Sequence, residues 1–179
     1  EIVVTQAREL DRLISDLLDA AQIDANRLSL ERGEVDLVAV SRDVLETLKS
    51  VTAEHLELEA PEAPVVGQWD RLRLAQILRN LVSNALKYSP DDGVVRVAVI
   101  DLGSRVQIAV TDQGIGIAPD VLPRLFGRFY RAETVKEDRL PGLGLGLYIT
   151  RSLVEAHRSE EHTSELQSHL NLVCRLLLE

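Results

Sequence analysis

LRNLVSNALKYSP, residues 78–90, forms the second half of the longest helix that the sequence predicts, which runs from an N-cap at Asp70 to about Tyr88. One side of this helix is apolar and is expected to be buried: Leu74, Leu78, Leu81 and Ala85. Helical spacing places a polar stripe beside that face: Asn80, Asn84, Lys87 and Tyr88. A stripe of this kind can hold a single ligand.

The side chains of this stripe suit a metal ion and a phosphate. An amide oxygen binds Mg²⁺ without adding charge, and the ammonium of Lys87 can meet phosphate oxygens as a point charge. The same pattern is also typical of an ordinary polar helix edge, so it gains meaning only beside the two motifs that follow it.

TDQGIGI, residues 111–117, places an acid at the end of a predicted strand and two glycines directly after it. Gly114 and Gly116 permit a tight turn and the close approach of a flat ring. The carboxylate of Asp112 can then accept a hydrogen bond from an exocyclic amine, which would select adenine. An acidic hairpin turn is the alternative explanation.

PGLGLGL, residues 141–147, precedes the last regular helix, at 146–157. The backbone N–H groups of Gly142, Gly144 and Gly146, together with the helix dipole, would form a cradle for an anion. A flexible linker has a similar glycine content, but the interleaved leucines and the helix that follows oppose that interpretation.

The other elements predict an α+β sandwich with helices on one face of a sheet. Asp36 caps a second helix, and Gly103-Ser104 joins a β-hairpin. The predicted elements are helices over the first 28 or so residues and at 38–48, strands at 55–60, 94–102 and 105–111, and a long irregular connection at 119–141.

The first helix has one apolar seam, formed by Leu10, Leu13, Ile14, Leu17, Leu18 and Ala21. Such a seam cannot be buried by the helix alone, so a partner helix is expected, and none precedes it in this chain.

The composition of the chain argues against several classes of function. Of the 179 residues 45% are hydrophobic, which is enough to bury a core, and the net charge of -9 argues against a general nucleic-acid-binding surface. No apolar run approaches the roughly 20 residues of a membrane span. The single cysteine, Cys174, allows no disulfide within the chain and suits a reducing compartment.

The last segment, residues 158–179, resembles the translation of a short-read sequencing adapter, from RSEEHTSELQS to LVCRLLLE. We therefore interpret it as a non-native tail and expect the sheet edge before it to be unpaired. A genuine amphipathic helix through Leu166, Leu170 and Val173 is the alternative.

Taken together, the motifs resemble the catalytic, ATP-binding region of bacterial sensor histidine kinases, within the GHKL superfamily that also contains DNA gyrase. LRNLVSNALKYSP resembles the N box, TDQGIGI and PGLGLGL the two glycine boxes, and LFGRFYR (125–131) the F box. The resemblance implies a Bergerat-type two-layer α/β sandwich at 33–157. It implies that residues 1–32 are the second helix of a dimerisation and phosphoacceptor hairpin, with its linker.

The resemblance also implies site roles, with ATP and Mg²⁺ as the ligands. Asn84 would bind Mg²⁺, while Asn80, Lys87 and Arg131 would act near the transferred phosphate. Phe126 and Phe129 would anchor a lid at 118–141. The remaining cofactor-binding positions implied are Tyr88, Asp112, Gly114, Gly116, Ile117, Gly142, Gly144, Gly146 and Leu147.

The implied activity is transfer of the γ-phosphate of ATP to a histidine on a hairpin helix that this chain lacks, for relay to a response regulator. Neither His55 nor His157 has the setting of that histidine. The resemblance further implies a homodimer and a cytoplasmic segment of a bacterial protein anchored in the inner membrane. A GHKL-type ATPase is the first alternative, but those enzymes carry a glutamate where this chain has Asn80, which cannot act as a base. A non-catalytic nucleotide-binding scaffold is the second.

Overall fold

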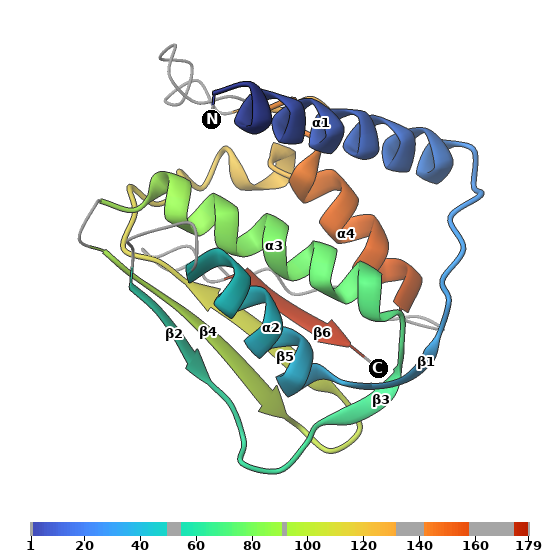
Figure 1. Cartoon of the computed structure of the whole chain (residues 1–179), viewed down its shortest axis with the longest axis vertical. Coiled ribbons are helices and arrows are strands. Elements are labelled where there is room, and N and C mark those ends of the chain that lie inside the picture. Colours follow the sequence, from blue (N-terminus) through green and yellow to red (C-terminus); the bar gives the residue numbers. More distant parts are fainter. Residues whose placement is uncertain (1, 50–54, 91–92, 132–141, 158–173, 179) are drawn as a thin grey trace.

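The computed structural model describes residues 2–49, 55–90, 93–131, 142–157 and 174–178. A four-stranded sheet has the order β2 (His55–Glu59), β4 (Val94–Asp101), β5 (Val106–Thr111) and β6 (Cys174–Leu178). Three helices cover one face of it: α2 (Leu37–Lys49), α3 (Arg71–Tyr88) and α4 (Gly146–His157) (Figure 1). This arrangement confirms the predicted α+β sandwich.

The sheet is mixed. β2 pairs with β4 in parallel, whereas β4 pairs with β5 and β5 with β6 in antiparallel fashion. The alternation of β4 sends Val95, Val97 and Val99 into the core against the helices. The hairpin turn at 102–105 follows the prediction, and Gly103 takes a positive φ of 84° there.

α3 and α2 begin at the two aspartates that the sequence indicates. Asp70 Oδ1 accepts from the main-chain N–H groups of Leu72 (3.0 Å) and Arg73 (3.1 Å), and Asp36 Oδ1 accepts from that of Val38 (3.0 Å). The buried face of α3 contains the four predicted residues and also Ile77 and Val82. α4 has the predicted bounds, and Leu145, Ile149 and Leu153 are buried beneath it.

Two short strands were not predicted. β1 (Gly33–Asp36) and β3 (Val66–Trp69) form a separate antiparallel pair. Each of these strands has only four residues, which is too short a pattern to stand out in the sequence. A 3₁₀ turn, η1 (Leu122–Arg124), is the one regular element in the described part of the irregular connection, at 119–131.

The expectation of an unpaired sheet edge is wrong for the described residues. β6 pairs with β5 along the edge that was expected to be open, from Val106↔Leu178 to Val110↔Cys174. The first part of the proposed tail, residues 158–173, lies outside the described residues.

α1 (Ile2–Asp24) lies over α3 and α4 on the side away from the sheet (Figure 1). Its predicted apolar seam faces outward: Leu10, Ile14, Leu17 and Leu18 are each more than half exposed. Ala20 and the half-buried Ile23 join the core. The seam therefore has the exposure expected of a helix whose partner belongs to another segment. No helix in the described ranges is both long and apolar enough to cross a membrane.

Candidate active site

A cavity of about 1600 Å³ opens between α3, the segment 112–131, the glycine run and the inner face of α1. It brings the three sequence motifs together, although Asn80 and Gly142 are 62 positions apart in the chain. The predicted site residues that line it are Asn80, Asn84, Lys87, Tyr88, Asp112, Gly116, Ile117, Phe129, Arg131, Gly142, Gly144, Gly146 and Leu147.

Asp112 lies at the end of β5 and is only 2% exposed. Its Oδ1 accepts from the main-chain N–H of Gly114 at 2.7 Å, while Oδ2 is buried and has no hydrogen-bond partner in the described part of the chain. Burial raises the pKa of the carboxyl, and the hydrogen bond from Gly114 opposes that effect. A buried acceptor without a partner costs stability unless a ligand satisfies it, so Asp112 Oδ2 is a strong candidate contact for a donor group.

Gly114 lies in the turn after Asp112, next to the end of α3. It is not among the residues that line the cavity, and a Cβ added there would lie 2.5 Å from the carbonyl oxygen of Tyr88 and 2.8 Å from Asp112 Oδ1. The glycine therefore allows the end of α3 to approach the Asp112 turn. Gly116, with a φ of 69°, lines the cavity and turns the chain after it.

The α3 stripe has two kinds of neighbour. The Asn80 amide donates weakly to the carbonyl of Gly146 (3.4 Å) and to Thr150 Oγ1 (3.5 Å), so this side chain joins α3 to the start of α4. Asn84 lines the main cavity and also a small adjoining one shared with Asp112 and Phe126. The stripe therefore places Asn84 between the acidic turn and the helix start.

The ammonium group of Lys87 lies near the ring of Tyr88 and near the glycine run. Its Nζ is 5.4 Å from the centroid of the Tyr88 ring and 3.8 Å from the position that a Cβ on Gly142 would take. Burial raises the pKa of the Tyr88 hydroxyl, and the charge of Arg131 acts in the opposite direction. The Arg131 guanidinium also donates to the carbonyl of Gly142 at 3.4 Å. Two cations thus lie near the glycine run, where an anion would lie.

The glycine run needs its glycines. Gly144 has a φ of 71°, and a Cβ there would lie 2.7 Å from the carbonyl oxygen of Tyr130. Gly142 has a φ of 149°. α4 begins at Gly146, so its first N–H groups and its positive dipole end lie beside the cavity.

The two phenylalanines differ. Phe126 is half-buried beside Leu125 and Leu147, whereas Phe129 is 53% exposed with a φ of 56° and lines the main cavity. Both lie on the described part of the expected lid; residues 132–141 lie outside the described residues. Arg128 forms an ion pair with Asp24 of α1, and the side chains of both residues remain partly exposed.

Sequence reasoning missed several lining residues, among them Arg73, Gln76 and Tyr130. Gln76 was detectable, because it lies one helical turn before Asn80 and extends the same stripe toward the start of α3. Arg73 and Tyr130 gave no comparable signal, since their place in the cavity depends on α1 and on the turn after η1.

The comparisons with known proteins agree with this geometry. The family described as histidine kinase-, DNA gyrase B-, and HSP90-like ATPase matches residues 69–176. The probable sensor protein PcoS of Escherichia coli is 35% identical over 97% of this chain and 37% of its own length. Sensor histidine kinase WalK of Bacillus subtilis is 32% identical over 87% of this chain and 26% of its own length. The chain thus spans about a third of the length of these relatives.

Solved structures show the same fold. A mycobacterial sensor histidine kinase, MprB, superposes with a TM-score of 0.69 and 26% identity, over 82% of this chain and 97% of that one. Full-length ShkA in complex with AMPPNP gives a TM-score of 0.72 and 26% identity, over 94% of this chain and 35% of that one. On the family match, the shared fold and the gathered motifs, this chain belongs to the histidine kinase-, DNA gyrase B- and HSP90-like ATPase family, and its relatives include sensor histidine kinases.

Proposed function

We propose that this chain binds Mg²⁺-ATP and forms the catalytic part of a sensor histidine kinase, which transfers the γ-phosphate to a histidine. The observation that carries the proposal is the buried, unpartnered Asp112 Oδ2 in the same cavity as the α3 stripe and the glycine run. These groups offer an acceptor for adenine, an amide for a metal and a cradle for phosphates within one cavity.

Different parts of the nucleotide would contact different motifs. Asp112 Oδ2 would accept from the exocyclic amine of adenine, with Gly114 supporting the turn and Ile117 and Gly116 beside the base. Tyr88 and Leu147 would contact the ribose or the phosphates. The N–H groups at Gly142, Gly144 and Gly146 would hold the phosphate oxygens at the start of α4.

The residues present fit a magnesium ion held jointly with phosphates. Asn84 offers a neutral oxygen donor and lines the small cavity that Asp112 also lines, and Mg²⁺ in nucleotide sites typically has few protein ligands and several phosphate or water oxygens. The metal would neutralise charge on the phosphates. Lys87 and Arg131 supply further positive charge close to Gly142.

The transfer step would form a bond between an imidazole nitrogen and the γ-phosphorus and break the bond to the bridging oxygen, with ADP as the leaving group. This chain would contribute positioning and charge: Lys87 and Arg131 at the phosphate, and Asn80 as a polar neighbour. Asn80 has no carboxylate to activate water, which favours transfer over hydrolysis.

The cavity is larger than one nucleotide requires. Ligand pockets usually measure about 300–1,000 Å³, and this one, at about 1600 Å³, continues past Asn80 to α1. The extra space would admit the side chain of an incoming phosphoacceptor histidine beside α1. We propose that residues 1–32 belong to the dimerisation hairpin and that residues 33–157 form the catalytic domain.

Three further features of the whole protein are part of the proposal. The outward seam of α1 would form a homodimer, a response regulator would receive the phosphate, and the segment would lie on the cytoplasmic side of a membrane-anchored protein. One related structure is a complex of the histidine kinase ThkA with a response regulator protein, TrrA.

Nucleotide binding is tested by titrating the chain with a fluorescent ATP analogue, with and without Mg²⁺, and by competition with ATP and GTP. Saturable, Mg²⁺-dependent binding with a preference for ATP is expected. A chain with an intact thermal unfolding transition and no saturable binding would contradict the proposal.

Transfer is tested in a chimera that joins this chain to a hairpin helix with a phosphoacceptor histidine, taken from a sensor histidine kinase. Incubation with γ-labelled ATP should give an acid-labile, base-stable phosphoprotein. Rapid phosphate release without labelling would instead identify a hydrolase, and nucleotide binding with neither reaction would identify a scaffold.

A further inference from the structure

Thr150 is a buried polar residue of α4 that lies beside the candidate active site without facing it. It follows Gly146 by one helical turn, and none of it is exposed to solvent (0%). Asn80 and Gly146 both line the cavity, whereas Thr150 is not among the described residues that do. Thr150 therefore cannot contact a bound nucleotide directly, and any part that it has in the reaction is exerted through a neighbour.

That neighbour is the carboxamide of Asn80, which is oriented by two contacts with α4. Its Nδ2 lies 3.4 Å from the carbonyl oxygen of Gly146 and 3.5 Å from Oγ1 of Thr150. A carbonyl oxygen can only accept a hydrogen bond, so the group that faces Gly146 is the NH₂ and not the amide oxygen. Both acceptors of this NH₂ thus lie on one helix, a single turn apart.

The amide oxygen of Asn80 is left on the other side. Within the described ranges it has no hydrogen-bond partner, and it is not one of the buried atoms that lack one, so it is accessible from the cavity. Asn80 therefore offers the cavity an acceptor, because its donor groups are already engaged with α4. This orientation does not suit a contact with phosphate oxygens, which are acceptors themselves.

The two contacts have different effects on the orientation. The Gly146 carbonyl decides which end of the carboxamide faces α4, since the reverse orientation would set two acceptors against each other. The Thr150 hydroxyl gives the NH₂ a second acceptor in a fully buried position. Both contacts are long and individually weak, so loss of the hydroxyl would leave the carboxamide poorly held.

We propose that Thr150 is a positioning residue for phosphoryl transfer, which fixes the carboxamide of Asn80 so that its oxygen faces the cavity as an acceptor. The inference rests on the proposed function, in which Asn80 lies near the transferred phosphate. An oxygen that is already oriented can accept from a donor group beside the phosphate without being ordered during the reaction. Thr150 thus supports the rate of transfer and contributes little to the affinity for ATP.

The orientation is tested first in the nucleotide-free chain, so this outcome does not depend on ATP binding. The NMR signals of the Asn80 NH₂ are assigned by their loss in Asn80→Ala, and their exchange with water is compared with that of Asn84. The Asn84 amide lies one turn later and makes no hydrogen bond with the described residues. In the parent the Asn80 NH₂ should exchange at least about threefold more slowly than that of Asn84. Thr150→Val should remove most of this difference, and Thr150→Ser, which keeps the hydroxyl, should preserve it.

Transfer is measured next, in the chimera that carries a phosphoacceptor helix. Thr150→Val keeps the shape of the side chain and should lower kcat about three- to tenfold, with the dissociation constant of Mg²⁺-ATP within about twofold of the parent value. Thr150→Ser should restore kcat. Ser152→Ala is the matched control, because it removes a hydroxyl from the same helix that donates to the Tyr148 carbonyl at 3.0 Å and faces no site residue. This variant should transfer phosphate at the parent rate.

A double-mutant cycle shows whether Thr150 acts through Asn80. In the Asn80→Ala background, Thr150→Val should cause no further loss of transfer, whereas a general structural role would lower the rate by the same factor in both backgrounds. The melting temperature of each variant confirms that the domain is folded.

The proposal is overturned if Thr150→Val leaves either the exchange of the Asn80 NH₂ or kcat at the parent value, if Thr150→Ser fails to restore them, or if the two substitutions act additively. A parent chimera that binds ATP without labelling its histidine would contradict the proposed function instead. The exchange rates of Asn80 would still decide its orientation in that case.

Discussion

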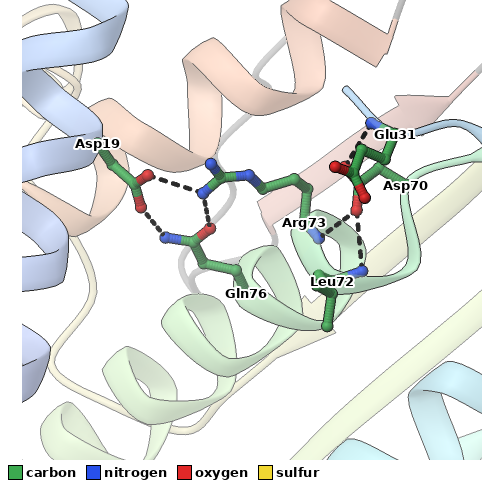
Figure 2. Close-up of polar contacts among 6 residues, drawn as sticks. All are labelled: Asp19, Glu31, Asp70, Leu72, Arg73 and Gln76. Atoms are coloured by element: carbon green, nitrogen blue, oxygen red, sulfur yellow. Dashed lines mark hydrogen bonds and ion pairs between the residues drawn. The ribbon is translucent and has the colours of Figure 1, made fainter. Parts of the chain in front are cut away.

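The main-chain N–H of Asp70 donates to Nε2 of His157 at 3.1 Å, although the two residues are 87 positions apart. The bond joins the N-cap of α3 to the last residue of α4. His157 is fully buried, and its Nδ1 lies 2.8 Å from the carbonyl oxygen of Leu153, which assigns the proton to Nδ1 and leaves Nε2 as the acceptor. Asp70 itself also accepts from the main-chain N–H of Glu31 at 2.9 Å (Figure 2). The linker and both site helices therefore meet at one place.

Stability should fall when His157 is protonated. Burial lowers its pKa, the positive charge of Arg32 lowers it further, and the Leu153 carbonyl and Asp70 act in the opposite direction. A His with a lowered pKa in the folded state stabilises the protein above its ordinary pKa, and that contribution is lost as the pH falls through the lowered value. Protonation would set Nε2–H against the Asp70 N–H.

The measurement is the melting temperature of the parent and of His157→Gln between pH 8 and pH 5. The variant should melt about 3–6 °C lower at pH 8, for the loss of about one hydrogen bond. The gap should narrow as the pH falls, since only the parent loses the histidine contribution. Parallel curves for the two proteins would contradict the prediction.

Asp112→Asn should separate function from stability. Burial raises the pKa of Asp112, so the cost of ionising it in the folded state appears as the pH rises above its ordinary pKa and is complete above the raised value. The amide variant avoids this cost. It should melt at or above the parent temperature at pH 7, converge with the parent in acid, and bind ATP at least about tenfold more weakly. A destabilised variant with normal ATP binding would show that Asp112 has a structural role.

Gly144→Ala should be far more harmful than Gly103→Ala. Both glycines have positive φ values, 71° and 84°, but nothing lies within 4 Å of a Cβ on Gly103, whereas one on Gly144 would meet the Tyr130 carbonyl at 2.7 Å. Gly103→Ala should cost about 1 kcal/mol of unfolding free energy from backbone strain alone. Gly144→Ala should cost about 1–3 kcal/mol more and abolish nucleotide binding, as measured by urea unfolding and ATP titration. Equal losses in the two variants would mean that the close approach of residues 130 and 144 relaxes easily.

Asn84→Ala should remove the dependence of ATP binding on Mg²⁺. In the parent, removal of the metal with EDTA should weaken ATP binding by about tenfold or more, because phosphate charge is then less well neutralised. In Asn84→Ala the affinity should already be low and should change little with EDTA. Ser104→Ala, which changes an exposed polar residue of the β4–β5 turn outside the cavity, serves as the control.

The helices and the hairpin were predictable because their sequence signals lie within a few residues of each other. Asp70 and Asp36 mark helix starts by side-chain capping, the period of α3 marks its buried face, and Gly103 marks a turn. The site residues were predictable for a different reason: each motif alone had an ordinary explanation, and only their joint order within the chain indicated a nucleotide.

The amino-acid sequence by itself determined the helices, the hairpin and the three motifs, since capping, periodicity and glycine turns act over a few residues. The tertiary structure alone decided which atoms of those motifs are without partners, such as Asp112 Oδ2, and which are already engaged, such as Arg128 with Asp24. It also turned the acidic face of α1 inward onto Arg73 and Gln76. Such contacts join residues more than 50 positions apart, and the energy that selects them arises only when packed elements bury or pair their charges.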